Sequence, residues 1–439
     1  MTRHVFVLGL DQHNLEILRR LPGAADLEFH RLLARRDLQS THIDIHELLH
    51  RAEEELRDAA DPIDAIVSFW DFPMVEMVPI LCSRYGLPSA DLRAVLRCEH
   101  KYWARLVQAD AIEEVPAFGL LDLDIPEPVL PEGMSYPVWI KPVNSASSEG
   151  AYRLEDDADL RRHLPDVRAV IDRLGSPFQD VLDMVPLPPE IERIGGQACL
   201  VEAAVGGRQM TLEGFSHGGE VVVYGVIDSF DYPDSSSFLR YQYPSSAPWE
   251  IQERLSDIAR KVITATGLTD STFNVEFFWD ERTGAINVLE VNARHSQSHA
   301  LLFEMVDGVS NHQAMLDVAF GRTPQLPHRT GPYGMAAKWF LRVFREDGIV
   351  RAVPSGEQIA ELERELPGTT IEVTAVVGER LSQRVSEDAY SYVMATIFTG
   401  GDDEATITRA FQRCVEALDF RIDEVAADGT TISDSGLEL

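Results

Sequence analysis

Cysteine, positive charge and long apolar runs are all scarce in this sequence, and each scarcity excludes a class of protein. Its 439 residues include four cysteines, and none of these forms a CxxC pair: Cys82, Cys98, Cys199 and Cys414. Scattered thiols of this kind speak against a disulfide framework or a cysteine zinc site and favour a reducing compartment. We therefore expect a cytoplasmic protein.

Positive charge is outweighed by acids. The chain has 39 Lys and Arg against 72 Asp and Glu, a formal net charge of −33. A surface this acidic repels phosphate backbones, so we expect no nucleic-acid partner. A nucleotide site in such a protein must supply its positive charge locally.

Long apolar runs are absent. No stretch of about 18 apolar residues occurs, so we expect no transmembrane helix and no membrane partner. The first ten residues, MTRHVFVLGL, lack a small-residue cleavage site and are followed at once by Asp11. We interpret them as containing a buried strand and not as a signal peptide.

The remaining sequence alternates strand-like and helix-like patterns. Short apolar runs at 5–10 and 65–70 flank an amphipathic helical pattern at 47–60, which predicts an α/β layer over roughly the first 100 residues. A second helical pattern covers 92–108, and a proline-rich acidic loop follows at 122–137. From residue 199 strands dominate, and the last 110 residues alternate strands and helices again.

The most informative stretch is FNVEFFWDERTGAINVLEVNAR, residues 273–294. Its two strands have period-two alternation, so Asn274 and Glu276 share one face, and Glu290 and Asn292 share a face of the second strand. The short turn between them brings the two glutamates within about 5–8 Å of each other. An ordinary hairpin with its acids in water remains one interpretation.

A divalent cation is the other interpretation, because two like charges among apolar neighbours are costly unless they are neutralised. Two carboxylates and an Asn amide form an oxygen-only ligand set, which suits Mg²⁺. Arg294 lies two residues beyond Asn292, in position for a phosphate or a carboxylate.

This stretch resembles the metal-binding hairpin of the ATP-grasp enzymes at Glu276, Glu290, Asn292 and Arg294. Upstream segments match in the expected order. CEHKYWARLVQ resembles the segment that carries the first ATP lysine, here Lys101. VWIKPVNSASSEGAYRL resembles the strand of the second, Lys141, and the mobile phosphate loop, here Ser147 and Ser148. CLVEAAVGGRQMTLEGF resembles the adenine hinge.

For the hinge, the resemblance implies that Glu202 faces the adenine amino group, with the Ala203 carbonyl and the Val205 N–H completing the contact. Gln209 stands where many relatives place an acid that faces the ribose. The resemblance also implies ATP with Mg²⁺, or Mn²⁺, held by Glu276, Glu290 and Asn292.

The resemblance covers about residues 1–430 and implies an α/β and α+β protein. The ATP-grasp fold is expected to follow an N-terminal Rossmann-like pre-ATP-grasp domain and to precede a C-terminal α+β lobe. The expected domains are 1–100 (pre-ATP-grasp), 101–200 (small lobe with linker helix), 201–325 (large lobe with metal hairpin), 326–430 (C-terminal lobe) and 431–439 (acidic tail).

The implied activity is that of a carboxylate–amine ligase. ATP activates a carboxylate as an acyl-phosphate, and an amine displaces phosphate to give an amino-acid or peptide-like product. Lys141 and Arg294 are the expected catalytic residues. The substrate candidates are Arg294, Ser298, His299, Arg240 and Glu213. Carboxylate and amine are expected to be small molecules, and a homodimer is one option for the assembly.

An alcohol or a thiol could replace the amine as the acceptor, and two other activities also stay open. Biotin carboxylases follow the asparagine with NxRxQVEH, whereas this chain reads NARHSQSH, with Ser298 in place of the glutamate that deprotonates bicarbonate. A non-catalytic ATP-binding regulator is the second alternative, although the expected lysines and metal ligands are all present. His295, His299 and His312 have poor spacing for zinc and are expected to border the substrate pocket or to be structural.

Overall fold

The computed structural model describes residues 2–40, 42–145, 149–233, 235, 237–344, 347–384, 391–425 and 431–435. The chain divides into two compact units. The first comprises Met1–Val226, Ala247–Gln297 and Asn311–Leu326, and the second comprises Ile227–Ser246, Ser298–Ser310 and Pro327–Leu439.

The first unit begins with a parallel sheet of order β2-β1-β3, as the α/β pattern predicts. The amphipathic helix α3 starts where Asp44 accepts the Glu47 N–H, and it buries one face that includes Leu48 and Leu56. The elements of this part are β1 (Arg3–Leu8), α1 (Gln12–Arg19), β2 (Leu27–Leu32), α2 (Arg35–Leu38), α3 (Ile45–Asp58), β3 (Ala65–Val67) and α4 (Met74–Tyr85).

The expected single helix at 92–108 is wrong, because the structure has two helices, α5 (Leu92–Glu99) and α6 (Lys101–Ala111). His100 separates them with an extended backbone and caps α6 by accepting the Trp103 N–H at Nδ1, 3.2 Å away. Its Nε2 lies 3.1 Å from the Gly195 carbonyl oxygen. Burial lowers the pKa of His100 to about 4, so the neutral ring accepts at Nδ1 and donates at Nε2.

A small antiparallel sheet of order β4-β7-β5-β6 follows. The helix α7 covers it, and Val167 and Ile171 pack against Val138, Ile140 and Val201. The elements are β4 (Phe118–Leu121), β5 (Val138–Pro142), β6 (Tyr152–Leu154), α7 (Asp157–Leu182), α8 (Pro189–Ile194) and β7 (Cys199–Ala203).

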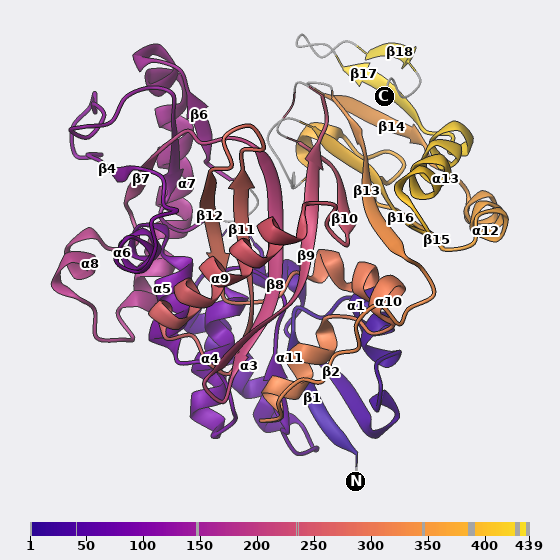
Figure 1. The fold of residues 1–439 in the computed structure, drawn as a ribbon, viewed down its shortest axis with the longest axis horizontal. Coiled ribbons are helices and arrows are strands. Elements are labelled where there is room, and N and C mark those ends of the chain that lie inside the picture. The colour runs from indigo at the N-terminus through magenta and orange to yellow at the C-terminus, as the bar shows by residue number, and fades with distance from the viewer. Residues whose placement is uncertain are drawn as a thin grey trace. The chain divides into compact units, whose positions relative to one another are not determined.

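The rest of the first unit is built on antiparallel strands in the order β12-β11-β8-β9. The helix α9 lies across β8, β11 and β12 (Figure 1), and its Leu255, Ile258 and Val262 pack on Phe273 and Val275. The elements are β8 (Arg208–His217), β9 (Glu220–Asp231), α9 (Trp249–Thr266), β11 (Ser271–Trp279), β12 (Ile286–Asn292) and α11 (His312–Ala319).

In the second unit, into which β9 continues, strands run in the order β10-β13-β16-β15, and β14, β17 and β18 form a separate sheet. Trp339 stacks on Phe411 with ring centroids 4.3 Å apart in the centre of its core. The elements are β10 (Phe238–Tyr243), α10 (Ala300–Asp307), β13 (Met335–Val343), β14 (Gly348–Ala352), α12 (Gly356–Glu365), β15 (Thr369–Val373), β16 (Tyr392–Gly401), α13 (Glu404–Ala417), β17 (Arg421–Val425) and β18 (Thr431–Ser435).

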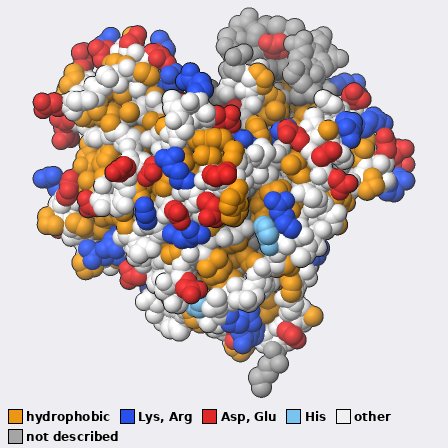
Figure 2. All heavy atoms as spheres, viewed as in Figure 1, with side chains coloured by type: hydrophobic (Ala, Val, Ile, Leu, Met, Phe, Trp, Pro, Cys, Tyr) orange, Lys and Arg blue, Asp and Glu red, His pale blue; other side chains and the backbone are white. Residues whose placement is uncertain are grey.

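The surface mixes both signs of charge. Figure 2 shows Lys and Arg side chains interspersed among Asp and Glu on one face, despite the net charge of −33. Among the helices that the structure describes, none has the length and apolar content needed to span a membrane.

Candidate active site

Two carboxylates face each other across the hairpin of β11 and β12. Glu276 and Glu290 are direct partners in the antiparallel register, and Asn274 is opposite Asn292. The alternating residues of β11 are apolar and buried on the side of α9: Phe273, Val275, Phe277 and Trp279. The period-two pattern therefore places both acids on the other face of the hairpin, as the sequence predicts.

The two glutamates have opposite electrostatic environments. Burial raises the pKa of Glu276 to about 7, and the charge of Glu290 adds to this rise. Burial also disfavours the charged form of Glu290, but Lys101 and Lys141 outweigh it and lower the pKa of that carboxyl. Lys101 Nζ lies 2.5 Å from Glu290 Oε1 and donates to the Ser145 carbonyl at 2.7 Å. A further cation beside Glu276 would keep both carboxylates ionised.

The residues here fit a magnesium ion. Glu276, Glu290 and Asn292 offer oxygen atoms only, which is the donor set that Mg²⁺ prefers. Asn292 Nδ2 donates to Asn274 Oδ1 at 2.9 Å, so its amide oxygen is the atom left to act as a ligand. Gln209 Nε2 donates to Glu276 Oε2 at 3.0 Å and orients that carboxylate. The contact of Gln209 with a ribose stays a prediction.

A second, largely buried charge cluster centres on Glu202. Glu202 on β7 forms ion pairs with both Arg105 and Lys141. Burial opposes the charge of Glu202, yet the two cations hold the pKa of its carboxyl down to about 2. Arg105 also donates to Gln108 and, at 2.7 Å, to the Leu289 carbonyl on β12. The cluster therefore ties α6, β5, β7 and β12 together.

Sequence reasoning missed Arg105, although a signal exists. It lies four residues after Lys101 on α6, so both cations share one helix face. If Lys101 binds phosphate, helical spacing predicts that a cation four residues later on the same helix lies near the same site.

Replacing Arg105 by methionine is expected to lower the free energy of unfolding by about 3 kcal/mol, because one partner of a buried ion pair is lost while Glu202 stays charged. Urea denaturation measures this. Arg260→Met is the matched control, because Arg260 pairs with Asp257 on the exposed side of α9. An exposed pair is worth about 1 kcal/mol or less. Equal losses in both variants would show that the buried cluster carries no special stability.

Arg294 lies in a group of carboxylates. Its Nε donates to Asp71 Oδ1 at 2.6 Å, and its Nη2 donates to the same oxygen. Burial opposes its charge, but Asp71, Glu99 and Glu213 outweigh it and raise the pKa of Arg294. Glu99 accepts the Ala293 N–H at 2.9 Å, and burial raises the pKa of Glu99 to about 7. Acids thus outnumber the cation around Arg294.

Glu76 on α4 completes this group. It is fully buried, and within the described part of the chain neither of its carboxylate oxygens has a hydrogen-bond partner. Burial, followed by the charges of Glu99 and Asp71, raises its pKa well above the ordinary value. The sequence analysis did not identify Asp71, Glu76 or Glu99. A signal exists for Asp71, which follows the carboxyl end of β3, where ligands bind in open α/β sheets.

The hinge after β7 is held by backbone hydrogen bonds. The Ala203 N–H donates to the Ala117 carbonyl at 2.8 Å, and the Ala204 N–H donates to the Pro137 carbonyl at 3.0 Å. The carboxylate of Glu202 is bonded to the two cations described above, and its expected contact with the adenine amino group stays a prediction. The same holds for the Ala203 carbonyl and the Val205 N–H.

Gly207, just after the hinge, has no room for a side chain. Its φ is +136°, and a Cβ there would lie 2.4 Å from the Trp279 carbonyl oxygen on β11. Gly207→Ala is therefore expected to cost about 2 kcal/mol of stability and to weaken ATP binding, measured by thermal unfolding with and without ATP. Gly206→Ala is the control, since a Cβ there meets nothing within 4 Å. A Gly207→Ala protein as stable as Gly206→Ala would contradict this account.

Of the remaining expected residues, Glu213 lies in the first unit. Its Oε1 accepts the Ser296 N–H at 3.0 Å, its Oε2 accepts from the Tyr224 hydroxyl at 3.3 Å, and it is buried. Because its charge acts on Arg294, it belongs to the acidic group around that guanidinium. Ser147 and Ser148 lie outside the described residues.

Three substrate candidates belong to the second unit: Arg240, Ser298 and His299. Arg240 forms an ion pair with Glu404. Lys338 donates to Ser298 Oγ at 3.1 Å, and His299 packs edge-on against Tyr241. Their contact with substrate stays a prediction.

The histidines form no joint zinc site in the described structure. His295 Nε2 lies 2.8 Å from His312 Nδ1, and His312 Nε2 lies 3.0 Å from Asn14 Oδ1. Burial lowers the pKa of His312 to about 3, so this ring is neutral. The buried chain of hydrogen bonds favours the structural interpretation of these two residues.

Comparison with known proteins gives one family match. Residues 134–300 match the family described as the ATP-grasp domain. A protein of Sinorhizobium fredii (strain NBRC 101917 / NGR234), described as uncharacterized protein y4rH, is 26% identical over 355 residues. That match covers 78% of this chain and 65% of the relative, so the chain spans a little under two thirds of the relative's length.

Three solved structures show the same fold. The L-amino acid ligase from Bacillus licheniformis has a TM-score of 0.69 at 14% identity and covers 95% of this chain and 98% of its own. The N5-carboxyaminoimidazole synthase from Aspergillus clavatus has a TM-score of 0.64 at 14% identity, covering 95% and 98%. The biotin carboxylase from Campylobacter jejuni has a TM-score of 0.60 at 14% identity, and the match covers 97% of this chain and 93% of the carboxylase chain.

Residues 134–300 match the ATP-grasp domain, and the chain has the fold of the ATP-grasp ligases. The expected fold class is confirmed.

Proposed function

We propose that this protein is an ATP-dependent ligase that joins a small carboxylic acid to an amine. The γ-phosphoryl group of ATP passes to a carboxylate oxygen of the acid, which gives an acyl-phosphate and ADP. The amine nitrogen then attacks the acyl carbon, the C–O bond to phosphate breaks, and the nitrogen loses a proton. The products are an amide, ADP and phosphate.

The observation that carries the proposal is the placement of Glu276 opposite Glu290. Lys101 forms an ion pair with Glu290, and the charge of Lys141 also lowers the pKa of Glu290. Phosphoryl transfer requires positioning and charge neutralisation more than covalent chemistry. Glu276, Glu290 and Asn292 would hold Mg²⁺, which supplies charge neutralisation at the phosphates when bound. Lys101 and Lys141 would bind phosphate oxygens as point charges.

The acids around Arg294 support an amine as the acceptor. Asp71, Glu76 and Glu99 carry more potential negative charge than the single guanidinium neutralises, so an ammonium group is a suitable counter-ion. Glu99, with a pKa of about 7, has the proton affinity needed to take a proton from the amine near neutral pH. Arg294 would hold the acyl-phosphate or the substrate carboxylate.

The two other activities fit the residues less well. Bicarbonate activation of the biotin-carboxylase type requires a base at residue 298, and a serine hydroxyl does not serve as one at neutral pH. A non-catalytic regulator would bind ATP with the same lysines and carboxylates, but it has no use for the acids around Arg294. The similarity to the L-amino acid ligase supports the same reaction class as our proposal.

The test is a substrate screen. Phosphate and ADP release from ATP–Mg²⁺ is measured across amino acids and small carboxylic acids, singly and in pairs, with mass spectrometry of the products. We expect release that depends on one pair and a product mass equal to both substrates minus water. Release with bicarbonate alone would indicate the carboxylase activity. Tight ATP binding without release for any compound would indicate a regulator.

A further inference from the structure

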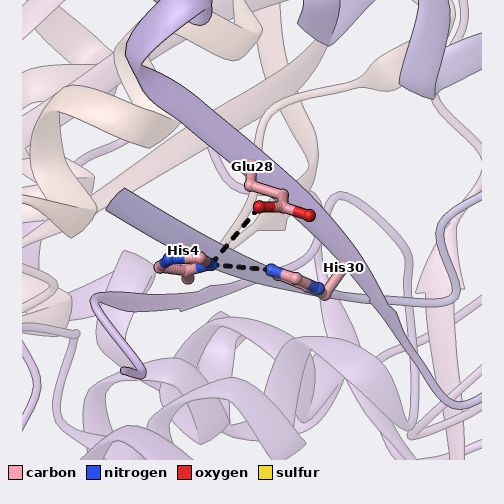
Figure 3. Close-up of side chains that lie close together, drawn as sticks. All are labelled: His4, Glu28 and His30. Atoms are coloured by element: carbon pink, nitrogen blue, oxygen red, sulfur yellow. Dashed lines mark hydrogen bonds and ion pairs between the residues drawn. The ribbon is translucent and has the colours of Figure 1, made fainter. Parts of the chain in front are cut away.

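A second group of metal-ligating side chains lies in the first unit, on the parallel sheet β2-β1-β3. His4 is on β1, Glu28 and His30 are on β2, and Asp61 precedes β3. In the register of the two strands, His4 pairs with Glu28 and Phe6 pairs with His30. Alternate residues of a strand share a face, so Glu28 and His30 project to the same side of the sheet, where they meet His4 (Figure 3).

The potential ligand atoms converge on a small volume. His4 Nδ1 lies 3.0 Å from His30 Nε2, 3.8 Å from Glu28 Oε2 and 3.9 Å from Asp61 Oδ2. The ligand atoms of His4, Glu28 and His30 all lie within 4.8 Å of one another. Around a tetrahedral ion with bonds of about 2.1 Å, neighbouring ligand atoms are roughly 3.4 Å apart. The observed separations lie on both sides of that value.

The surroundings hold the two rings in place and leave an entry path. The His4 side chain is largely buried, and its backbone N–H donates to Asp64 Oδ2 at 2.8 Å. His30 stacks on Phe6, with centroids 4.8 Å apart. The Glu28 side chain is 59% exposed, so an ion can reach the rings from solvent.

We propose that His4, His30 and Glu28 bind one transition-metal ion of the Zn²⁺ class, with the Asp61 carboxylate close to His4. Two imidazole nitrogens with carboxylate oxygens favour such an ion over Mg²⁺, which prefers oxygen ligands only. The site is at the amino-terminal ends of β1 and β2, whereas Asp71 follows the carboxyl end of β3 and bonds Arg294. The ion therefore links β1 and β2, and it is separate from the ATP-grasp residues.

The test is Zn²⁺ binding to the metal-stripped full-length chain, measured by calorimetry in excess Mg²⁺, so that the oxygen-only site is filled. We expect one Zn²⁺ per chain and the visible absorption of tetrahedral Co²⁺ when Co²⁺ replaces it. Loss of a metal ligand should lower the affinity for Zn²⁺ at least as much as loss of a residue that hydrogen-bonds a ligand, which costs about 10- to 100-fold. We therefore expect His30→Gln to weaken Zn²⁺ binding by about 100-fold or more, and Glu28→Gln by at least about tenfold. Both side chains are partly exposed, and thermal unfolding without metal verifies that the variants fold.

The control is His50→Gln. His46 and His50 are exposed and lie four residues apart on α3, so they form another histidine pair on this unit with a spacing suited to chelation. We expect this variant to bind Zn²⁺ as the unmodified chain does. Loss of binding in His50→Gln with binding retained in His30→Gln would overturn the proposal, and so would equal weak binding in every variant.

Discussion

Replacing Glu290 by glutamine is expected to reduce ATP turnover by about 10²–10³-fold, the usual cost of losing one preorganised electrostatic group at a reaction centre. The variant removes one of the two charges that face each other on the hairpin, and it also removes the ion pair of Lys101. Phosphate release at saturating ATP and substrates measures the effect. Because the fall is in kcat, raising ATP alone should not restore the rate.

Glu281→Gln is the matched control for this change. Glu281 is in the turn of the same hairpin, its side chain is 59% exposed, and Arg208 lies 3.5 Å away. The same loss of one negative charge there is expected to leave turnover within about twofold, as exposed ion pairs contribute little. A Glu290→Gln enzyme that turns over at the normal rate would contradict the assignment of the metal site.

Replacing Arg294 by glutamine is expected to have a comparable effect on turnover, about 10²–10³-fold, but by a different route. Arg294 is bonded to Asp71, whereas Lys141 is bonded to Glu202, so we expect ATP affinity to change less than turnover does. The substrate carboxylate or acyl-phosphate loses its cation, and KM for the acid should rise. Equilibrium binding of ATP, measured beside steady-state kinetics, separates the two effects.

Arg282→Gln serves as the control for Arg294. Arg282 is in the turn between β11 and β12, and its side chain is 90% exposed. It carries the same charge without contact to the buried acids, and we expect no change in kinetics. Loss of ATP binding in Arg294→Gln would indicate that Arg294 binds the nucleotide and not the acid, which would contradict the proposed role.

The hairpin could be predicted because it is local. Both strands, their alternation and the short turn lie within 22 consecutive residues, so period-two geometry alone brings Glu276 to Glu290. The order of Lys101, Lys141 and the hinge followed from the resemblance. The amphipathic helix α9 also has a local signal, because an apolar stripe and a C-terminal Gly267 mark it.

The acids around Arg294 could not be predicted in this way. Asp71 is 223 residues from Arg294, and Glu99 meets Ala293 across 194 residues, so only the folded chain brings them together. The break at His100 has the same origin. The apolar pattern runs through it, and the bond between His100 and Gly195, 95 residues away, helps to hold this ring where α6 begins.

The measurement that tests the central claim most directly is oxygen transfer from the acid to phosphate. The carboxylic acid found in the screen is labelled with ¹⁸O in its carboxylate, and the released phosphate is analysed by mass spectrometry. An acyl-phosphate intermediate predicts one ¹⁸O in each phosphate, because the bridging oxygen leaves with phosphorus when the amine attacks. Unlabelled phosphate formed together with amide would show that ATP does not activate the carboxylate in this way and would contradict the account.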